Sequence, residues 1–107
     1  MVTEVTVPTL RAWHEWMFGS QRRAVMLIDR ALSWLDDRDV DYHPLAFDTL
    51  VTGAWCRLGT GDITSAGRLI ERAHAQASSF PSAWNQLQAG HLRARLALIT
   101  GEPTQAL

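Results

Sequence analysis

The 107-residue sequence contains no lysine, only one cysteine and no marked excess of charge of either sign. Its ten basic residues are all arginine, and eleven acidic residues nearly balance them, for a formal net charge of −1. A chain without a basic surplus lacks the electrostatic footprint of a protein that binds nucleic acid or an anionic membrane surface. Cys56 has no second cysteine with which to form an internal disulfide. We therefore expect no direct nucleic-acid partner and no disulfide framework.

Long hydrophobic runs and export signals are also missing. No apolar stretch approaches the roughly 20 residues that a membrane-spanning helix needs, and the first ten residues lack the basic and apolar segments of a secretory signal. The sequence from 2 to 7 alternates with a period of two, but a single short strand would have no partner. Residues 1–7 are therefore expected to be an ordered or frayed leader. The length fits one domain, which we expect to be cytoplasmic and without a membrane partner.

Four prolines and three of the seven glycines divide the rest of the chain into helical segments. Proline is tolerated in the first turn of a helix, and the prolines that precede apolar or alanine-rich segments are Pro8, Pro44, Pro81 and Pro103. Glycine favours the left-handed cap after a helix, and the glycines at such places are Gly19, Gly61 and Gly101, followed by Ser20, Asp62 and Glu102. These signals predict an all-α fold with helices at about 8–18, 21–36, 44–59, 63–78, 81–100 and from 103 onward.

The glycines also mark a repeat, because Gly61 lies 42 positions after Gly19 and Gly101 lies 40 positions after Gly61. In this register, alanines recur seven residues before and five residues after each glycine, at Ala12, Ala54, Ala94, Ala24, Ala66 and Ala106. A period near 40 residues with two helices per unit is typical of an α-solenoid, in which each unit covers the apolar face of the next. We therefore predict a single domain of antiparallel helix pairs, with two full repeats and an incomplete third at about 8–43, 44–80 and 81–107.

The recurring alanines predict close packing between the two helices of each pair. Alanine at facing positions lets two helix axes approach to roughly 8 Å, the short end of the usual range. Three and four residues after Ala24 and Ala66, larger side chains follow on the same face, at Leu27, Ile28, Leu69 and Ile70. One turn later the pattern is completed by Ala31 and Ala73. All these positions are expected to be buried between helices.

These residues resemble the tetratricopeptide repeat, whose signature places a small residue in the first helix and a Gly-Asp turn seven residues later. The second unit follows that signature with Ala54, Gly61-Asp62, Ala66, Ile70 and Ala73, and the first unit with Ala12, Gly19-Ser20, Ala24, Ile28 and Ala31. The period here is six to eight residues longer than the 34 residues usual for that family. Long, degenerate repeats of this kind are similar to the helical-repeat regions of large bacterial LuxR-type, ATP-binding transcription regulators. The resemblance implies stacked helix pairs around a concave groove.

No motif of a catalytic or metal site is complete in the sequence. His14-Glu15 begins like the zinc motif H-E-x-x-H, but Phe18 stands where the second histidine is needed. The aspartates from Asp37 to Asp48 have the spacing of a calcium loop, but Tyr42 replaces its essential glycine. Cys56 has no neighbouring catalytic signature, so a small buried hydrophobe is the favoured interpretation. We expect no enzyme activity, no metal and no cofactor.

The five tryptophans are the most informative side chains. Trp13 and Trp55 each follow a register alanine, and Arg95 stands at the equivalent place in the third unit. The tetratricopeptide resemblance implies that this position faces the concave groove, and tryptophan and arginine dominate binding hot spots. The alternative is that the rings only pack against the adjacent first helix. The predicted partner-binding residues are Trp13, Trp16, Trp55, Leu58, Arg95 and Leu98, with Arg57 as a weaker candidate on the rim.

Two functions remain open on the sequence alone. The first is a non-enzymatic helical-repeat module that binds a protein or peptide, either as a regulatory protein or as part of a larger transcription regulator. The second is a small-molecule sensor, which would need an enclosed cavity with convergent polar groups rather than an open groove. The apolar residues of 81–100 lack a complete partner helix, so we expect a second copy of the chain, in a homodimer, or the remainder of a longer chain to cover them.

Overall fold

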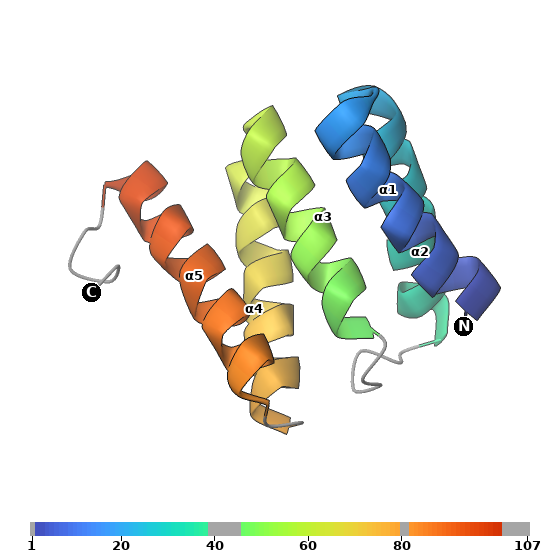
Figure 1. Ribbon diagram of the computed structural model, residues 1–107. Helices are drawn as coiled ribbons and strands as arrows, with labels where there is room; N and C mark the ends of the chain where they lie inside the picture. Colours follow the sequence, from blue (N-terminus) through green and yellow to red (C-terminus); the bar gives the residue numbers. More distant parts are fainter. Residues whose placement is uncertain (1, 39–45, 80–81, 102–107) are drawn as a thin grey trace.

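The computed structural model describes residues 2–38, 46–79 and 82–101, which are helical almost throughout (Figure 1). A π-helical turn, η1 (Val2–Thr6), leads directly into the first of five α-helices. The helices are α1 (Val7–Phe18), α2 (Gln21–Arg38), α3 (Ala46–Thr60), α4 (Ile63–Ser79) and α5 (Ala83–Thr100). No strand occurs in these ranges, which confirms the all-α prediction, and each of the five helices ends within two residues of its predicted bounds.

The helices form two layers. Helices α1, α3 and α5 lie side by side in the first layer, and α2 and α4 lie behind them (Figure 1). Helix α1 packs along α2, and α3 packs along α4; each pair is joined by two residues and is therefore antiparallel. Each helix of the first layer also contacts the next, whereas the described backbones of α2 and α4 stay apart. Helix α3 is thus surrounded on most sides, and it supplies the largest share of the buried side chains.

Glycine and a capping side chain close the turn between α3 and α4, as predicted. Gly61 has φ +83°, and Gly101 after α5 has φ +80°, a left-handed conformation that other residues adopt only with strain. Asp62 Oδ1 then accepts a hydrogen bond from the Ser65 amide at 3.3 Å in the first turn of α4. Hydrogen bonds from Ser65 hold the pKa of the exposed Asp62 carboxyl below its usual range.

The turn between α1 and α2 departs from the prediction of a left-handed glycine. Gly19 has φ −133°, because the Glu15 side chain closes this turn instead, accepting a hydrogen bond from the Ser20 amide at 2.9 Å. Ser20 still caps α2 as predicted, since its hydroxyl accepts from the Arg23 amide at 3.2 Å. Pro8 lies in the first turn of α1, as expected. The remaining predicted boundary residues lie outside the described ranges: Pro44, Pro81, Glu102, Pro103 and Ala106.

The predicted leader is an ordered part of the folded domain. Val5 in η1 is fully buried, in a small hydrophobic cluster with Leu35 of α2 and Ala46 of α3. The Thr9 hydroxyl donates a hydrogen bond to the Val5 carbonyl at 2.7 Å and ties the turn to α1. Alternating residues form a strand only beside another strand, and here the available surface is helical. The leader therefore continues α1 and covers one end of the core.

The alanine seam is confirmed in both full helix pairs. Alanines that are fully buried at the predicted register positions are Ala12, Ala24, Ala31, Ala54, Ala66 and Ala73. Ile28 and Ile70 are fully buried among them, as expected. Ala94, the equivalent residue of α5, is only half-buried. The register alanines are therefore buried in two helix pairs, whereas α5 has an open side.

Replacing Ala66 by leucine is expected to lower the free energy of unfolding by about 1–3 kcal/mol. Ala66 is fully buried in the main core, so three added carbon atoms must displace neighbouring side chains or separate α3 from α4. Ala75→Leu, at an exposed position of the same helix, is the matched control and should change stability by less than about 0.5 kcal/mol. Chemical denaturation of both variants provides the measurement. Coincident unfolding curves for Ala66→Leu and the wild type would refute the seam assignment.

Ion pairs link the helices on the outer side of the molecule. The Arg57 guanidinium of α3, predicted as a weaker candidate on the groove rim, pairs with Asp29 of α2. Arg72 of α4 pairs with Asp36 of α2 at 2.7 Å and bridges the space between these two helices. Exposed pairs of this kind contribute at most about 1 kcal/mol each. They fix the alignment of α2 with its neighbours more than they stabilise the fold.

Candidate binding groove

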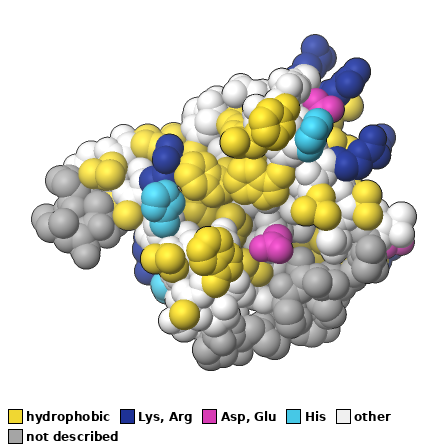
Figure 2. All heavy atoms as spheres, in the orientation of Figure 1, with side chains coloured by type: hydrophobic (Ala, Val, Ile, Leu, Met, Phe, Trp, Pro, Cys, Tyr) yellow, Lys and Arg dark blue, Asp and Glu magenta, His cyan; other side chains and the backbone are white. Residues whose placement is uncertain are grey.

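The three helices of the first layer form the walls and floor of a groove. A cavity of about 350 Å³ opens between α1 and α5, with the start of α3 as its floor. Figure 2 shows this face of the molecule, where hydrophobic side chains gather in the middle, over α3 and its two neighbours. The cavity is lined by Thr6, Thr9, Leu10, Trp13, Asp48, Thr49, Val51, Trp84 and Gln88. The groove therefore combines two indole rings with hydroxyl, amide and carboxylate groups.

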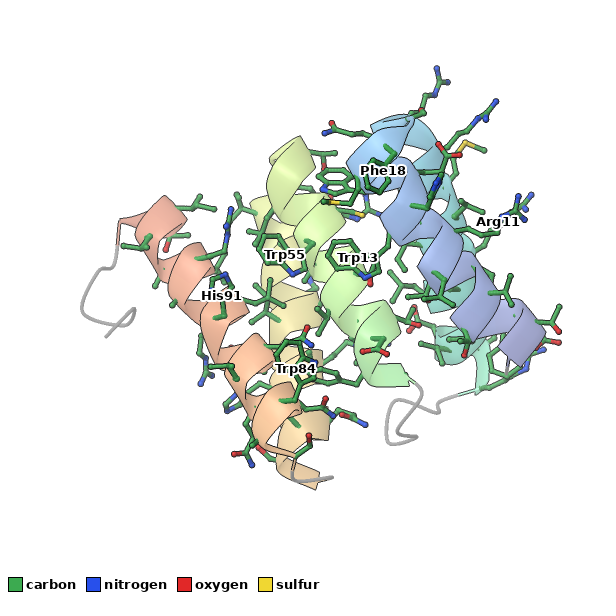
Figure 3. The ribbon with its side chains drawn as sticks, viewed as in Figure 1. Arg11, Trp13, Phe18, Trp55, Trp84 and His91 are labelled. Atoms are coloured by element: carbon green, nitrogen blue, oxygen red, sulfur yellow. The ribbon has the colours of Figure 1, made fainter. Side chains whose placement is uncertain are left out.

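Beside this cavity, a row of aromatic side chains runs from α1 over α3 to α5 (Figure 3). The ring centroids of Trp13 and Trp55 are 6.5 Å apart, with the planes tilted by 56°. The Trp55 centroid lies 5.7 Å from that of His91 on α5. The Arg95 guanidinium carbon stands 4.5 Å from the Trp55 centroid, within the range of a cation–π interaction. The predicted row of Trp13, Trp55 and Arg95 is thus a continuous surface across three helices.

The other predicted partner-binding residues lie in different places. Leu58 is 9% exposed and belongs to the main hydrophobic core, so its side chain is not available to a partner and this prediction is wrong. Trp16 is half-buried and packs at the seam of α1 and α3, where a Cβ at position 59 would overlap its ring. Gly59 therefore makes room for the Trp16 indole. Leu98 is 62% exposed near the end of α5, but it does not line the cavity.

Sequence reasoning missed several groove residues that follow the same register. Ten residues before each repeat glycine stand Thr9, Val51 and His91. Thirteen residues before each glycine stand Thr6, Asp48 and Gln88. Five of these six residues line the cavity, and the sixth, His91, stacks on Trp55. Chemically unlike residues at equivalent positions give no motif, so only the register of the glycines could have identified them.

Two threonines form a buried polar contact beneath the cavity. Thr9 Oγ1 and Thr49 Oγ1 are 2.7 Å apart and join α1 to α3. The single hydroxyl proton of Thr9 is already directed to the Val5 carbonyl, so Thr49 must donate to Thr9. Both hydroxyls are buried, and a buried polar group left without a partner costs free energy. This pair therefore fixes the spacing of α1 and α3 at the floor of the groove.

The charges of the groove are separated along its length. Among the described residues that line the cavity, Asp48 is the only one with an acidic or basic side chain. The Arg95 guanidinium lies over the ring of Trp55. Trp55 follows Asp48 by seven residues on α3, about 10 Å along the helix axis. Helix α5 also places His91 at that end of the groove. The negative charge of Asp48 in the cavity and the positive charge of Arg95 over Trp55 are therefore separated along the first layer.

The described residues offer no metal centre. Within residues 2–38, 46–79 and 82–101, no three histidine, cysteine or acidic side chains are placed to hold a metal ion. The aspartates with calcium-like spacing fall largely on 39–45, outside the described residues. In the same part of the chain, no helix combines the length and hydrophobicity needed to cross a bilayer. Comparison with known proteins matches no family model, no curated protein and no solved structure.

Cys56 is expected to react with a thiol reagent only after the protein unfolds. Cys56 is a buried residue of α3, and desolvation raises the pKa of its thiol to about 11 from an ordinary value of 9.0. At pH 8 this shift alone lowers the thiolate fraction by about 100-fold, before access is considered. Because burial penalises the thiolate, this shift lowers the stability of the fold as the pH rises from 9 to about 11 and has no effect below pH 9. Absorbance with dithiobis(nitrobenzoate), with and without denaturant, gives the ratio of rates; equal rates would contradict the burial.

Proposed function

We propose that this chain is a tetratricopeptide-like helical-repeat module whose groove binds a segment of another protein. The solenoid arrangement is supported by the contacts of α1 with α3 and of α3 with α5, with α2 and α4 placed behind. It is also supported by the two-residue turns within both helix pairs and by the buried alanines at equivalent positions. In such an array the first helix of each pair lines the binding surface, because the second helices occupy the outer layer.

The observation that carries the proposed binding role is the aromatic and cationic row across the groove. Trp13, Trp55 and Arg95 come from three helices and touch in sequence, with His91 beside them. The two indoles are half-buried, so each ring supports the wall and still presents part of its surface. Partly exposed tryptophan and arginine in a concave site are the side chains that contribute most to protein recognition. The two interpretations of the tryptophans are therefore compatible, since packing orients the rings.

The resemblance to the helical-repeat regions of bacterial LuxR-type regulators supports a regulatory role in a larger assembly. Such a module is cytoplasmic and non-enzymatic, and it acts by holding a partner. The raised pKa of the buried Cys56 thiol makes it a poor nucleophile, which agrees with a binding role. Small helical modules of this type recognise extended or helical segments along a groove.

We expect peptides selected from a random display library for binding to this protein to require Arg95 for their affinity. Arg95→Ala should weaken their binding by at least about tenfold, or about 1.4 kcal/mol, because the exposed guanidinium stacks on Trp55 at the centre of the row. Arg68→Ala, an exposed arginine on α4 in the other layer, is the matched control and should change the affinity by less than about twofold. Calorimetric titration measures both. Selected peptides that bind the two variants equally would exclude the groove as the binding surface.

The cavity also favours a second function, the sensing of a small molecule. Its volume of about 350 Å³ lies within the range of small-ligand sites, and polar groups converge on it from three helices. A sensor would be stabilised by its ligand, so a compound that raises the melting temperature of the wild type and not of Trp84→Ala would support this function. Peptide binding that persists when such a compound fills the cavity would separate the two roles.

A further inference from the structure

The cavity end of the groove has the composition of a site for a cation. Asp48, in the first turn of α3, places one negative charge in the lining of this cavity. Trp13 of α1 and Trp84 of α5 line the same cavity from opposite walls, and Figure 3 shows them on either side of α3. Within the described ranges, no arginine or histidine forms an ion pair with Asp48, which is exposed. We infer that this end of the groove binds the guanidinium of an arginine side chain in the partner segment.

Stacking of guanidinium on indole is already used twice within this chain. Arg95 stacks on Trp55 at 4.5 Å, and Arg38 stacks on Trp34 at 4.1 Å. Trp84 is 63% exposed and has no such internal partner in the described part of the chain, although its ring lines a cavity. An arginine from a partner can supply the missing cation, because the indole face attracts a planar guanidinium. This step rests on the proposed peptide-binding function of the groove.

The polar lining is rich in acceptors, which suits a guanidinium. This group has five N–H donors and no acceptor. Asp48 offers two carboxylate oxygens that can bind it in a bidentate manner, and the Thr6 hydroxyl and Gln88 amide oxygen stand in the same lining. A carboxylate ligand would find no cationic side chain among the described residues of this lining. The chemistry therefore favours arginine over an acidic residue at this end.

Two opposing charges reduce the field of Asp48 without cancelling it. The positive end of the α3 dipole lies near Asp48, but it amounts to roughly half an elementary charge. Arg95 stands over Trp55, about 10 Å along α3, which is close to one Debye length at physiological salt. Because Arg95 lies apart from Asp48, a partner segment can place an acidic residue at Arg95 and its arginine at Asp48. The site thus also sets the direction in which a segment lies.

Nuclear magnetic resonance of the tryptophan indole N–H groups tests the site without a partner protein. The probe is N-acetyl-arginine amide, and the matched neutral probe is N-acetyl-citrulline amide, which has nearly the same shape. The arginine probe should shift the Trp13 and Trp84 signals and leave that of Trp34 on α2 unchanged. Citrulline should bind at least about fivefold more weakly, since it lacks the charge. A third probe, N-acetyl-lysine amide, should also bind more weakly than the arginine probe, because an ammonium group is not planar and cannot bind a carboxylate in a bidentate manner.

Two variants test whether Asp48 is responsible for binding of the arginine probe. Asp48→Asn keeps the shape of the side chain and should weaken binding of the arginine probe by at least about fivefold. Asp37→Asn, an exposed aspartate on α2, is the matched control and should leave it within about twofold. Equal binding of citrulline or lysine, or an unchanged affinity in Asp48→Asn, would overturn the guanidinium site. Selected peptides whose binding depends on Arg95 of the protein but on no arginine of their own would overturn the guanidinium site and leave the peptide-binding function intact.

Discussion

Replacing Phe47 by alanine is expected to lower the free energy of unfolding by about 3–5 kcal/mol. Among the described residues, Phe47 is the largest fully buried side chain, 1% exposed, and it lies on α3 in the main core. The substitution removes the apolar contacts of the ring and leaves a cavity that the surrounding helices can fill only in part. A domain of this size is stable by only about 5–15 kcal/mol, so the loss is a large part of the total.

Phe18→Ala is the matched control for this experiment. The same atoms are removed from the end of α1, where Phe18 is 79% exposed and touches mainly the His14 ring. Its effect should stay below about 0.5 kcal/mol. Urea denaturation followed by circular dichroism measures both variants, and the difference between them isolates the effect of burial. Similar losses for Phe47→Ala and Phe18→Ala would mean that α3 is not the centre of the core.

The second large effect is expected on self-association, which we predict to occur through the open side of α5. In the repeat register, Leu87 and Leu98 of α5 are equivalent to Phe47 and Leu58 of α3. The two residues of α3 are buried beneath neighbouring helices, whereas Leu87 is 64% and Leu98 is 62% exposed. No described helix covers these leucines, and a face that another repeat buries is seldom left in water.

The spacing of this face suits a second copy of the same chain. Leu87, Gly90, Ala94 and Leu98 recur every three or four residues and share one side of α5. The order is nearly symmetric, with two small residues between two leucines. An antiparallel α5 from a second copy would therefore place each leucine near the other leucine and allow close approach at the centre. Such a two-fold contact is self-complementary and closes as a homodimer.

Sedimentation equilibrium at micromolar concentration should give twice the 12.0 kDa chain mass for the wild type. Leu98→Asp should shift the protein to monomer, because two unpaired carboxylates would then be buried in the contact. Leu10→Asp introduces the same change on α1, at a leucine that is similarly exposed, and should leave the dimer intact. A wild-type monomer that does not aggregate, or a Leu10→Asp variant that dissociates equally, would contradict an interface on α5.

The groove could be only partly predicted from the sequence. Trp13, Trp55 and Arg95 share one register position, and the structure brings them together as expected. Trp84 and Asp48 were not identified, because they stand at different register positions and meet only where α1, α3 and α5 converge. Leu58 lies on the same helix as Trp55, but its side chain is on a face of α3 that is buried in the core. A sequence pattern places residues along a helix more accurately than it orients them toward a neighbour.

The sequence by itself determined the helices, their turns and the alanine seam. These features depend on local preferences: proline in a first helical turn, glycine with positive φ at residues 61 and 101, and small residues at a regular spacing. Tertiary structure alone decided that Gly19 is not a left-handed cap, that Arg57 turns toward Asp29 and that Trp16 fills the space above Gly59. In each case a long side chain found its partner on another element or another turn. Such choices depend on distances and angles between packed groups, which no local preference encodes.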